Sequence, residues 1–143
     1  MGLLSFSEIT DKIDGLEESN ILVAALEFRI FTHLGTQVRT AEYVSRKAKL
    51  TFEGTVALLD ALCAMSVLIK TKGKYKNSAE TYKHLCEASK DYKNGTVFLK
   101  KETRDEWSDL INVIQRGRKE DEGGDDPAFR ELFTHAMHER SEK

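Results

Sequence analysis

The chain has 143 residues, about the length of one domain, and 40% of them are hydrophobic while 32% are charged. This composition is typical of a globular protein. The formal net charge of −2 provides no long-range attraction to nucleic acid or to anionic lipid, which excludes binding that relies on bulk charge.

No segment has the pattern of a membrane span or of an export signal. The longest apolar run, Ile21 to Leu26, is far shorter than the ~20 residues that cross a bilayer. Residues 1–6 lack a basic start and a long apolar stretch. We therefore expect a cytoplasmic protein with no membrane partner. Cys63 and Cys86 have no CxxC spacing, so we expect two buried free thiols rather than a disulfide or a zinc site.

Two helices are predicted before residue 35. Ser7 can cap the first, residues 7–19, whose apolar stripe should lie against another element. The second, residues 20–34, is apolar around nearly its whole circumference, and such a helix is buried on all sides. In a small domain one of its faces needs a further partner, such as a second subunit, unless flanking helices of the same chain cover both faces. We predict a homodimer interface made by Leu22, Val23, Leu26, Phe28, Ile30 and Phe31.

A short helix-turn-helix and a hairpin follow. Gly35 should end the preceding helix, and Thr40 and Thr51 should cap the next two. Residues 67–69 and 75–77 read as strands around a Lys72-Gly73 turn. Four lysines alternate along this segment: Lys70, Lys72, Lys74 and Lys76. The alternation predicts that they share one face of the hairpin. This face could bind phosphate or could simply be solvated, and we favour the solvated face.

The remaining chain reads as helices. Ser78 should open a short one, a longer one should span about residues 97–116, and Asp126-Pro127 should start the last, with its apolar stripe toward residue 137. The expected fold is mainly α and winged-helix-like, with one small β-hairpin and additional C-terminal helices. We expect a single domain, 1–143, made of an N-terminal helix (1–19), a winged-helix core (20–78), following helices (79–117) and a last helix (127–143).

The helix that would read DNA in such a fold is poorly suited to that task. Residues 51–69 contain no Lys, Arg, Asn or Gln, whereas Glu53 and Asp60 are acidic. Base edges and phosphates are contacted mainly by side chains of those missing types. We therefore predict a pairing module rather than a nucleic-acid reader.

Several runs together resemble a known family. They are ALEFRIF at 25–31, RTAEYV at 39–44, LLDAL at 58–62 and GKYKNS at 73–78, followed by Phe133, Ala136, Met137 and Ser141 on the last helix. In this order they are similar to the N-terminal dimerisation domain of S-adenosylmethionine-dependent small-molecule O-methyltransferases. The resemblance implies a homodimer and, for a complete enzyme, methyl transfer to a small-molecule hydroxyl with S-adenosylmethionine as cofactor.

The resemblance also implies a Rossmann-like catalytic domain, which we expect to be missing from these 143 residues. None of the nine glycines forms the G-x-G of a methyl-donor loop, and the family's catalytic His belongs to that domain. We therefore expect no catalytic and no cofactor-binding residue here, and no activity of this chain alone. Phe133 and Met137 are our candidates for lining the substrate pocket, with ordinary core packing as the open alternative.

The histidines and the winged-helix order raise two further possibilities, a metal site and a DNA-binding regulator. His135 and His138 lie three residues apart, but two ligands do not close a metal site, so no metal is predicted. A stand-alone winged-helix regulator that binds DNA remains an alternative, as does a non-catalytic partner of a full-length methyltransferase.

Overall fold

The computed structural model describes residues 2–102, 110–117 and 127–141. These residues form two compact units, 1–89 and 90–143, which are described separately. The fold is mainly α-helical with one two-stranded antiparallel hairpin, as the sequence predicts. The elements of the first unit are α1 (Phe6–Glu27), α2 (Ile30–Leu34), α3 (Ala41–Ala48), α4 (Phe52–Ala64), β1 (Leu68–Thr71), β2 (Lys74–Asn77) and α5 (Ala79–Leu85).

Helix α1 is longer than expected and its end lies elsewhere. A capping box between Ser5 and Glu8 starts it, not Ser7, and it runs through the expected boundary at residues 19–20 to Glu27. The predicted continuous helix 20–34 is instead broken at Phe28 and Arg29. Arg29 has a left-handed backbone (φ 55°), and its N–H bonds to the Leu26 carbonyl, so the chain turns into α2. No glycine or proline marks this turn.

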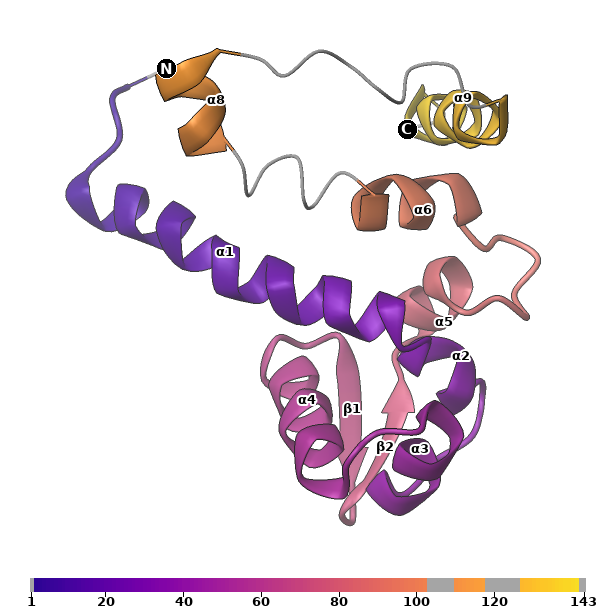
Figure 1. Ribbon diagram of the computed structural model, residues 1–143. Coiled ribbons are helices and arrows are strands. Elements are labelled where there is room, and N and C mark those ends of the chain that lie inside the picture. Colours follow the sequence, from indigo (N-terminus) through magenta and orange to yellow (C-terminus); the bar gives the residue numbers. More distant parts are fainter. Residues whose placement is uncertain (1, 103–109, 118–126, 142–143) are drawn as a thin grey trace. The chain divides into compact units, whose positions relative to one another are not determined.

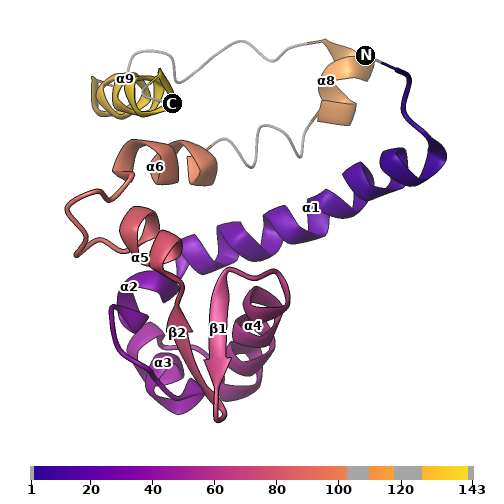
Figure 2. The same cartoon turned by 180° about the vertical axis from the view of Figure 1, so that it is seen from behind.

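The helix-turn-helix forms as predicted. The Thr40 hydroxyl accepts from the N–H of Tyr43, and the Thr51 hydroxyl accepts from that of Gly54. Gly35 ends α2 with φ 58°, a conformation that glycine adopts without a steric penalty. Figures 1 and 2 show the C-terminal part of α1 lying across the other helices and the hairpin of this unit. The buried core of the unit consists of Ala25, Ile30, Phe31, Leu34, Ala41, Val44, Leu59, Leu62, Leu68 and Tyr75.

The hairpin corrects the prediction of a single lysine face. Its turn is Lys72-Gly73, and Lys70 pairs with Tyr75 while Lys76 pairs with Ile69. Directly paired residues lie on the same face, and neighbours alternate, so Lys70 shares the face of the buried Tyr75 whereas Lys74 and Lys76 lie on the other. The two-residue turn pairs even-numbered positions of one strand with odd-numbered positions of the other, which is why the alternation of lysines does not continue on one face.

A buried amide fastens the hairpin to the helices. The Asn77 side-chain nitrogen donates to the carbonyls of Phe31 and Gly35, both at 2.9 Å, and thus satisfies carbonyls at the end of α2. Ser78 then caps α5, as predicted, by accepting from the N–H of Thr81. The wing and the short helices around residue 35 are therefore joined by side-chain hydrogen bonds as well as by apolar packing.

The second unit contains α6 (Asn94–Glu102), α8 (Leu110–Arg116) and α9 (Pro127–Ser141). Helices α6 and α9 pack closely, because a Cβ at Gly95 would lie only 2.6 Å from the backbone nitrogen of Ala136. The buried Glu139 carboxylate accepts from the Thr96 N–H at 2.9 Å and from its hydroxyl, so it caps the first turn of α6. Gly117 follows α8 with φ 82°, as expected for a stop. The middle of the predicted helix 97–116 and the predicted loop 118–126 lie outside the described residues.

Candidate pairing surface on the first helix

The two halves of α1 have different surroundings. In the C-terminal half, Leu22, Ala25 and Leu26 pack with the core. In the N-terminal half, four large apolar side chains follow the helical spacing and are exposed: Phe6 (80%), Ile9 (45%), Ile13 (66%) and Leu16 (66%). We call these four residues the apolar stripe. Figures 1 and 2 show this half of α1 extending past the core of its own unit.

The predicted interface residues do not all lie on the surface. Ile30 and Phe31 are 0% and 1% exposed and belong to the core of the single chain, so that part of the prediction is corrected. Leu22, Val23 and Leu26 are half-buried, and Phe28 is exposed. The apolar circumference of residues 20–34 is largely covered by the same chain, which was the alternative left open. The turn at Arg29 makes this possible, because it redirects Ile30 and Phe31 into the core.

The stripe was partly visible in the sequence. The i, i+4, i+7 spacing of Ile9, Ile13 and Leu16 already indicated a face in need of a partner. Phe6 was missed because Ser7 was expected to cap the helix, whereas the capping box at Ser5 starts the helix two residues earlier. The S-x-x-E spacing of Ser5 and Glu8 is the signal that would have placed it.

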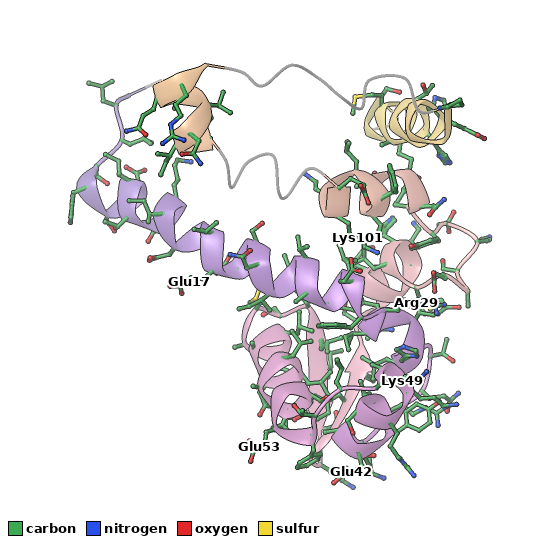
Figure 3. The ribbon with its side chains drawn as sticks, viewed as in Figure 1. Glu17, Arg29, Glu42, Lys49, Glu53 and Lys101 are labelled. Carbon is green, nitrogen blue, oxygen red and sulfur yellow. The ribbon has the colours of Figure 1, made fainter. Side chains whose placement is uncertain are left out.

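An open apolar pocket of about 420 Å³ lies beside the C-terminal part of α1. Ala24 and Phe28 contribute one side, and Leu50, Gly54 and Leu58 contribute the other. Lys49 and Thr51 complete its lining, and Lys49 is labelled in Figure 3. We call this pocket the α1–α4 groove. Its small residues, Ala24 and Gly54, leave room for apolar side chains from elsewhere.

Charged and titratable side chains around α2 interact with one another. Arg29 donates to Glu87 through two of its nitrogens, and this guanidinium lowers the pKa of the Glu87 carboxyl. Loss of solvent around His33, with the charge of Arg29 in addition, lowers the pKa of its imidazole. Both shifts favour a neutral histidine beside an ionised carboxylate near α2.

A second polar network joins α4 to the hairpin. The Asp60 carboxylate accepts from the Lys70 ammonium at 2.8 Å and from the Tyr75 hydroxyl at 2.6 Å. The hydrogen bond from Lys70 is the main cause of the lowered pKa of Asp60. Lys70 is thus directed toward Asp60, whose carboxylate neutralises it.

The histidines and cysteines of the described residues have the following surroundings. The described residues contain no cluster of three or more potential metal ligands, and His135 faces Glu139 at 3.7 Å. Cys63 and Cys86 are free thiols, and loss of solvent raises the pKa of Cys63, which disfavours the reactive thiolate.

The two predicted pocket-lining residues lie on α9. Met137 is half-buried beside the buried Ala136, whereas the side chain of Phe133 is outside the described part of the molecule. The helix itself, with its apolar periodicity, forms as predicted.

Comparison with known families decides what kind of domain this is. The sequence pattern of the O-methyltransferase dimerisation domain matches residues 10–89. The chain belongs to this family. The match ends at the last residue of the first compact unit and includes Ile13, Leu16 and the whole α1–α4 groove. A comparison with curated protein sequences finds no significant match.

Solved O-methyltransferases share the fold. An O-methyltransferase family protein from Burkholderia thailandensis is 25% identical, with a TM-score of 0.81 over 99% of this chain and 44% of that one. Human N-acetylserotonin methyltransferase, solved with SAM, is 20% identical, with a TM-score of 0.71 over 98% of this chain and 47% of that one. This chain therefore spans less than half the length of either protein. No helix in the described ranges is long and apolar enough to cross a membrane.

Proposed function

We propose that this dimerisation domain pairs two copies of its own chain through the exposed face of α1. The apolar stripe is the observation that carries the proposal, because four large apolar side chains on one helical face are a costly surface for a domain that works alone. Burying one such side chain contributes about 1.5–3 kcal/mol, and a two-fold dimer buries each of them twice. Membership of a dimerisation-domain family agrees with this role.

We further propose that the pair serves S-adenosylmethionine-dependent methyl transfer to a small-molecule hydroxyl. Support comes from the relatives that share the fold, of which the human enzyme was solved with SAM. In this proposal the methyl donor and the catalytic base are held by a catalytic domain like that of the family. Phe133 and Met137 on α9 remain our candidates for contact with the methyl acceptor, where an aromatic ring and a thioether would suit a flat apolar molecule.

The hairpin register weakens the case for a DNA-binding regulator. Lys70 is paired with Asp60, and the remaining wing lysines are split between the turn and the opposite face. Helix α4, which would enter the major groove, carries Glu53 and Asp60 and no cation. We therefore propose no nucleic-acid partner.

Light scattering across a wide dilution range tests the pairing. The unmodified chain should have the mass of a dimer, and the double substitution Ile13→Asp with Leu16→Asp should give a folded monomer. Val38→Asp is the matched control, because Val38 is also exposed, at 46%, but lies between α2 and α3. A monomeric unmodified chain would refute the proposal, as would a dimer that survives the double substitution. A dimer that also binds a full-length relative would favour the non-catalytic partner role.

A further inference from the structure

Basic residues are concentrated in the segment between α1 and α4. Helix α1 carries one basic and six acidic residues. Residues 28–50 carry one acidic residue, Glu42, and five basic ones: Arg29, Arg39, Arg46, Lys47 and Lys49. Arg29 is paired with Glu87, but no described carboxylate forms an ion pair with any of the other four. This segment is therefore a local source of positive charge in a chain whose formal net charge is −2.

The dipole of α3 accounts for three of these cations but not for Arg39. Arg46 and Lys47 lie in the last turn of the helix and Lys49 at its C-cap, where the backbone carbonyls carry partial negative charge. Arg39 instead precedes the N-cap residue Thr40. That end of the helix carries partial positive charge, which disfavours a cation. The position of Arg39 therefore has a cost that its own helix does not offset.

The side chain of Arg39 also lacks a hydrogen-bond partner. Its Nε atom is buried and has no acceptor among the described residues. Native proteins contain few buried donors of this kind, because each one is destabilising. The backbone of Arg39 is nevertheless firmly held, since its N–H donates to the Tyr75 carbonyl and its carbonyl accepts from the Tyr75 N–H, both at 2.8 Å. The residue is thus fixed at a place where its guanidinium lacks an anion.

Tyr43 holds two of the cations close together. The guanidinium carbon of Arg39 lies 4.3 Å from the centroid of the Tyr43 ring, and the Lys47 nitrogen lies 5.7 Å from it. The two charges are therefore no more than about 10 Å apart. We call Arg39, Tyr43 and Lys47 the cationic platform. Its two charges repel each other, and an anion placed between them would relieve this repulsion.

The positive region reaches α2 as well. Loss of solvent is the main cause of the lowered pKa of His33, and the charges of Arg29 and Lys47 lower this pKa further against the opposing charge of Glu87. Lys47 thus acts on a residue of α2 as well as on the ring of Tyr43. The platform and the neighbouring end of α2 form one surface that favours negative charge.

We propose that the cationic platform binds an acidic segment of a partner protein, with one carboxylate at Arg39 and a second at Lys47. A carboxylate matches the two parallel N–H groups of a guanidinium. In an extended peptide, residues i and i+2 point to the same side and lie about 7 Å apart, which is within the separation of the two cations. The inference goes beyond pairing through α1, because no residue of the platform belongs to that helix.

Magnitudes favour an acidic segment over a single small anion or a nucleic acid. One exposed ion pair contributes about 1 kcal/mol or less, so useful affinity requires several carboxylates on one chain. A nucleic-acid duplex presents phosphates over a wider area, and there α4 would place Glu53 and Asp60 against them. A short peptide needs to contact only the platform.

A peptide titration of the full chain tests the proposal. The probe is an eight-residue peptide of alternating Gly and Glu, and the same peptide with Gln in place of Glu is the uncharged control. In an NMR titration of the isotope-labelled chain, the Arg39 Nε–H and the Tyr43 amide signals should shift with the acidic peptide only. Arg39→Gln and Lys47→Gln should each weaken binding by about 5-fold or more. Lys12→Gln removes the same charge from an exposed position of α1 and should leave the affinity within about twofold.

Circular dichroism first confirms that the variants keep the helical fold. Arg39→Lys retains the charge but not the planar donor pair, so its affinity should lie between those of Arg39→Gln and the unmodified chain. No shift with the acidic peptide up to about 5 mM would overturn the proposal, as would equal effects of Arg39→Gln and Lys12→Gln. If inorganic phosphate or a short DNA duplex shifts the same signals at lower concentration than the peptide, the platform serves another class of anion, and the proposal is wrong.

Discussion

Gly95 illustrates how one missing side chain sets the distance between two helices. Its neighbour across the α6–α9 contact is backbone, not a flexible side chain, so an added methyl group would force the helices apart. Gly95→Ala should therefore lower the free energy of unfolding of the second unit by about 1–3 kcal/mol, as overpacking does. The hydrogen-exchange rates of the α9 amides measure this change in the free energy of unfolding.

Gly15 is the matched control for that substitution. It also lies in a helix, but nothing stands within 4 Å of a Cβ there. Gly15→Ala should stabilise α1 by up to about 1 kcal/mol, because alanine has the higher helix propensity. Equal effects of the two substitutions would show that helix propensity, not the close approach to Ala136, controls the result.

His33 gives the first unit a pH dependence with a defined sign. Its folded-state pKa is lowered, mainly by loss of solvent, so the folded state binds fewer protons than the unfolded state. The associated stability is fully present above the ordinary histidine value of about 6.5 and is lost as the pH falls through the folded pKa. Urea unfolding should require less denaturant at pH 5.5 than at pH 7.5. His33→Gln should flatten that difference, and an unchanged difference would contradict this assignment.

At the scale of elements, the break after α1 directs the residues of α2 into the core. Phe31 is enclosed by the core, whereas Phe52, the first residue of α4, is half exposed. Phe31→Ala should reduce the free energy of unfolding by about 3–5 kcal/mol, while Phe52→Ala should cost less than about 1 kcal/mol. Denaturant titrations at one protein concentration compare the two. Similar losses would mean that residues 30–34 are not the centre of the core.

The elements that were predictable are those with local signals. Thr40, Thr51 and Ser78 each bond to a backbone N–H three residues later, and a sequence pattern captures that interaction. The break at Arg29 had no such signal, because a left-handed arginine is stabilised by its tertiary surroundings rather than by local preference.

The candidate surface was predictable only in part for the same reason. Apolar periodicity located helices that need partners, but it could not say whether the partner is the same chain. Ile30 and Phe31 were assigned to a second subunit because the turn that buries them was not visible. The groove is formed by residues of α1 and α4, which are far apart in the sequence but close in space. The spacing of residues along the chain does not indicate such a contact.

At the scale of the whole molecule, the first unit has the features of an independent folding domain. It contains the described core cluster. The match to the dimerisation-domain family ends at residue 89, which is also the last residue of this unit. A fragment of residues 1–89 should fold cooperatively and retain the dimer mass of the full chain. Circular dichroism during thermal unfolding, with light scattering, would check both properties. An unfolded fragment would show that residues 90–143 are needed to complete the core.

The two-residue turn of the hairpin has a consequence for how this domain can change over evolutionary time. Substitutions at Lys72 alter little beyond the local backbone preference, because the turn lies outside the core. Inserting or deleting one residue there would reverse the alternation along β2, turn Tyr75 away from Asp60 and bring a lysine inward. Descendants of this sequence should therefore vary freely in the composition of the turn while keeping its length.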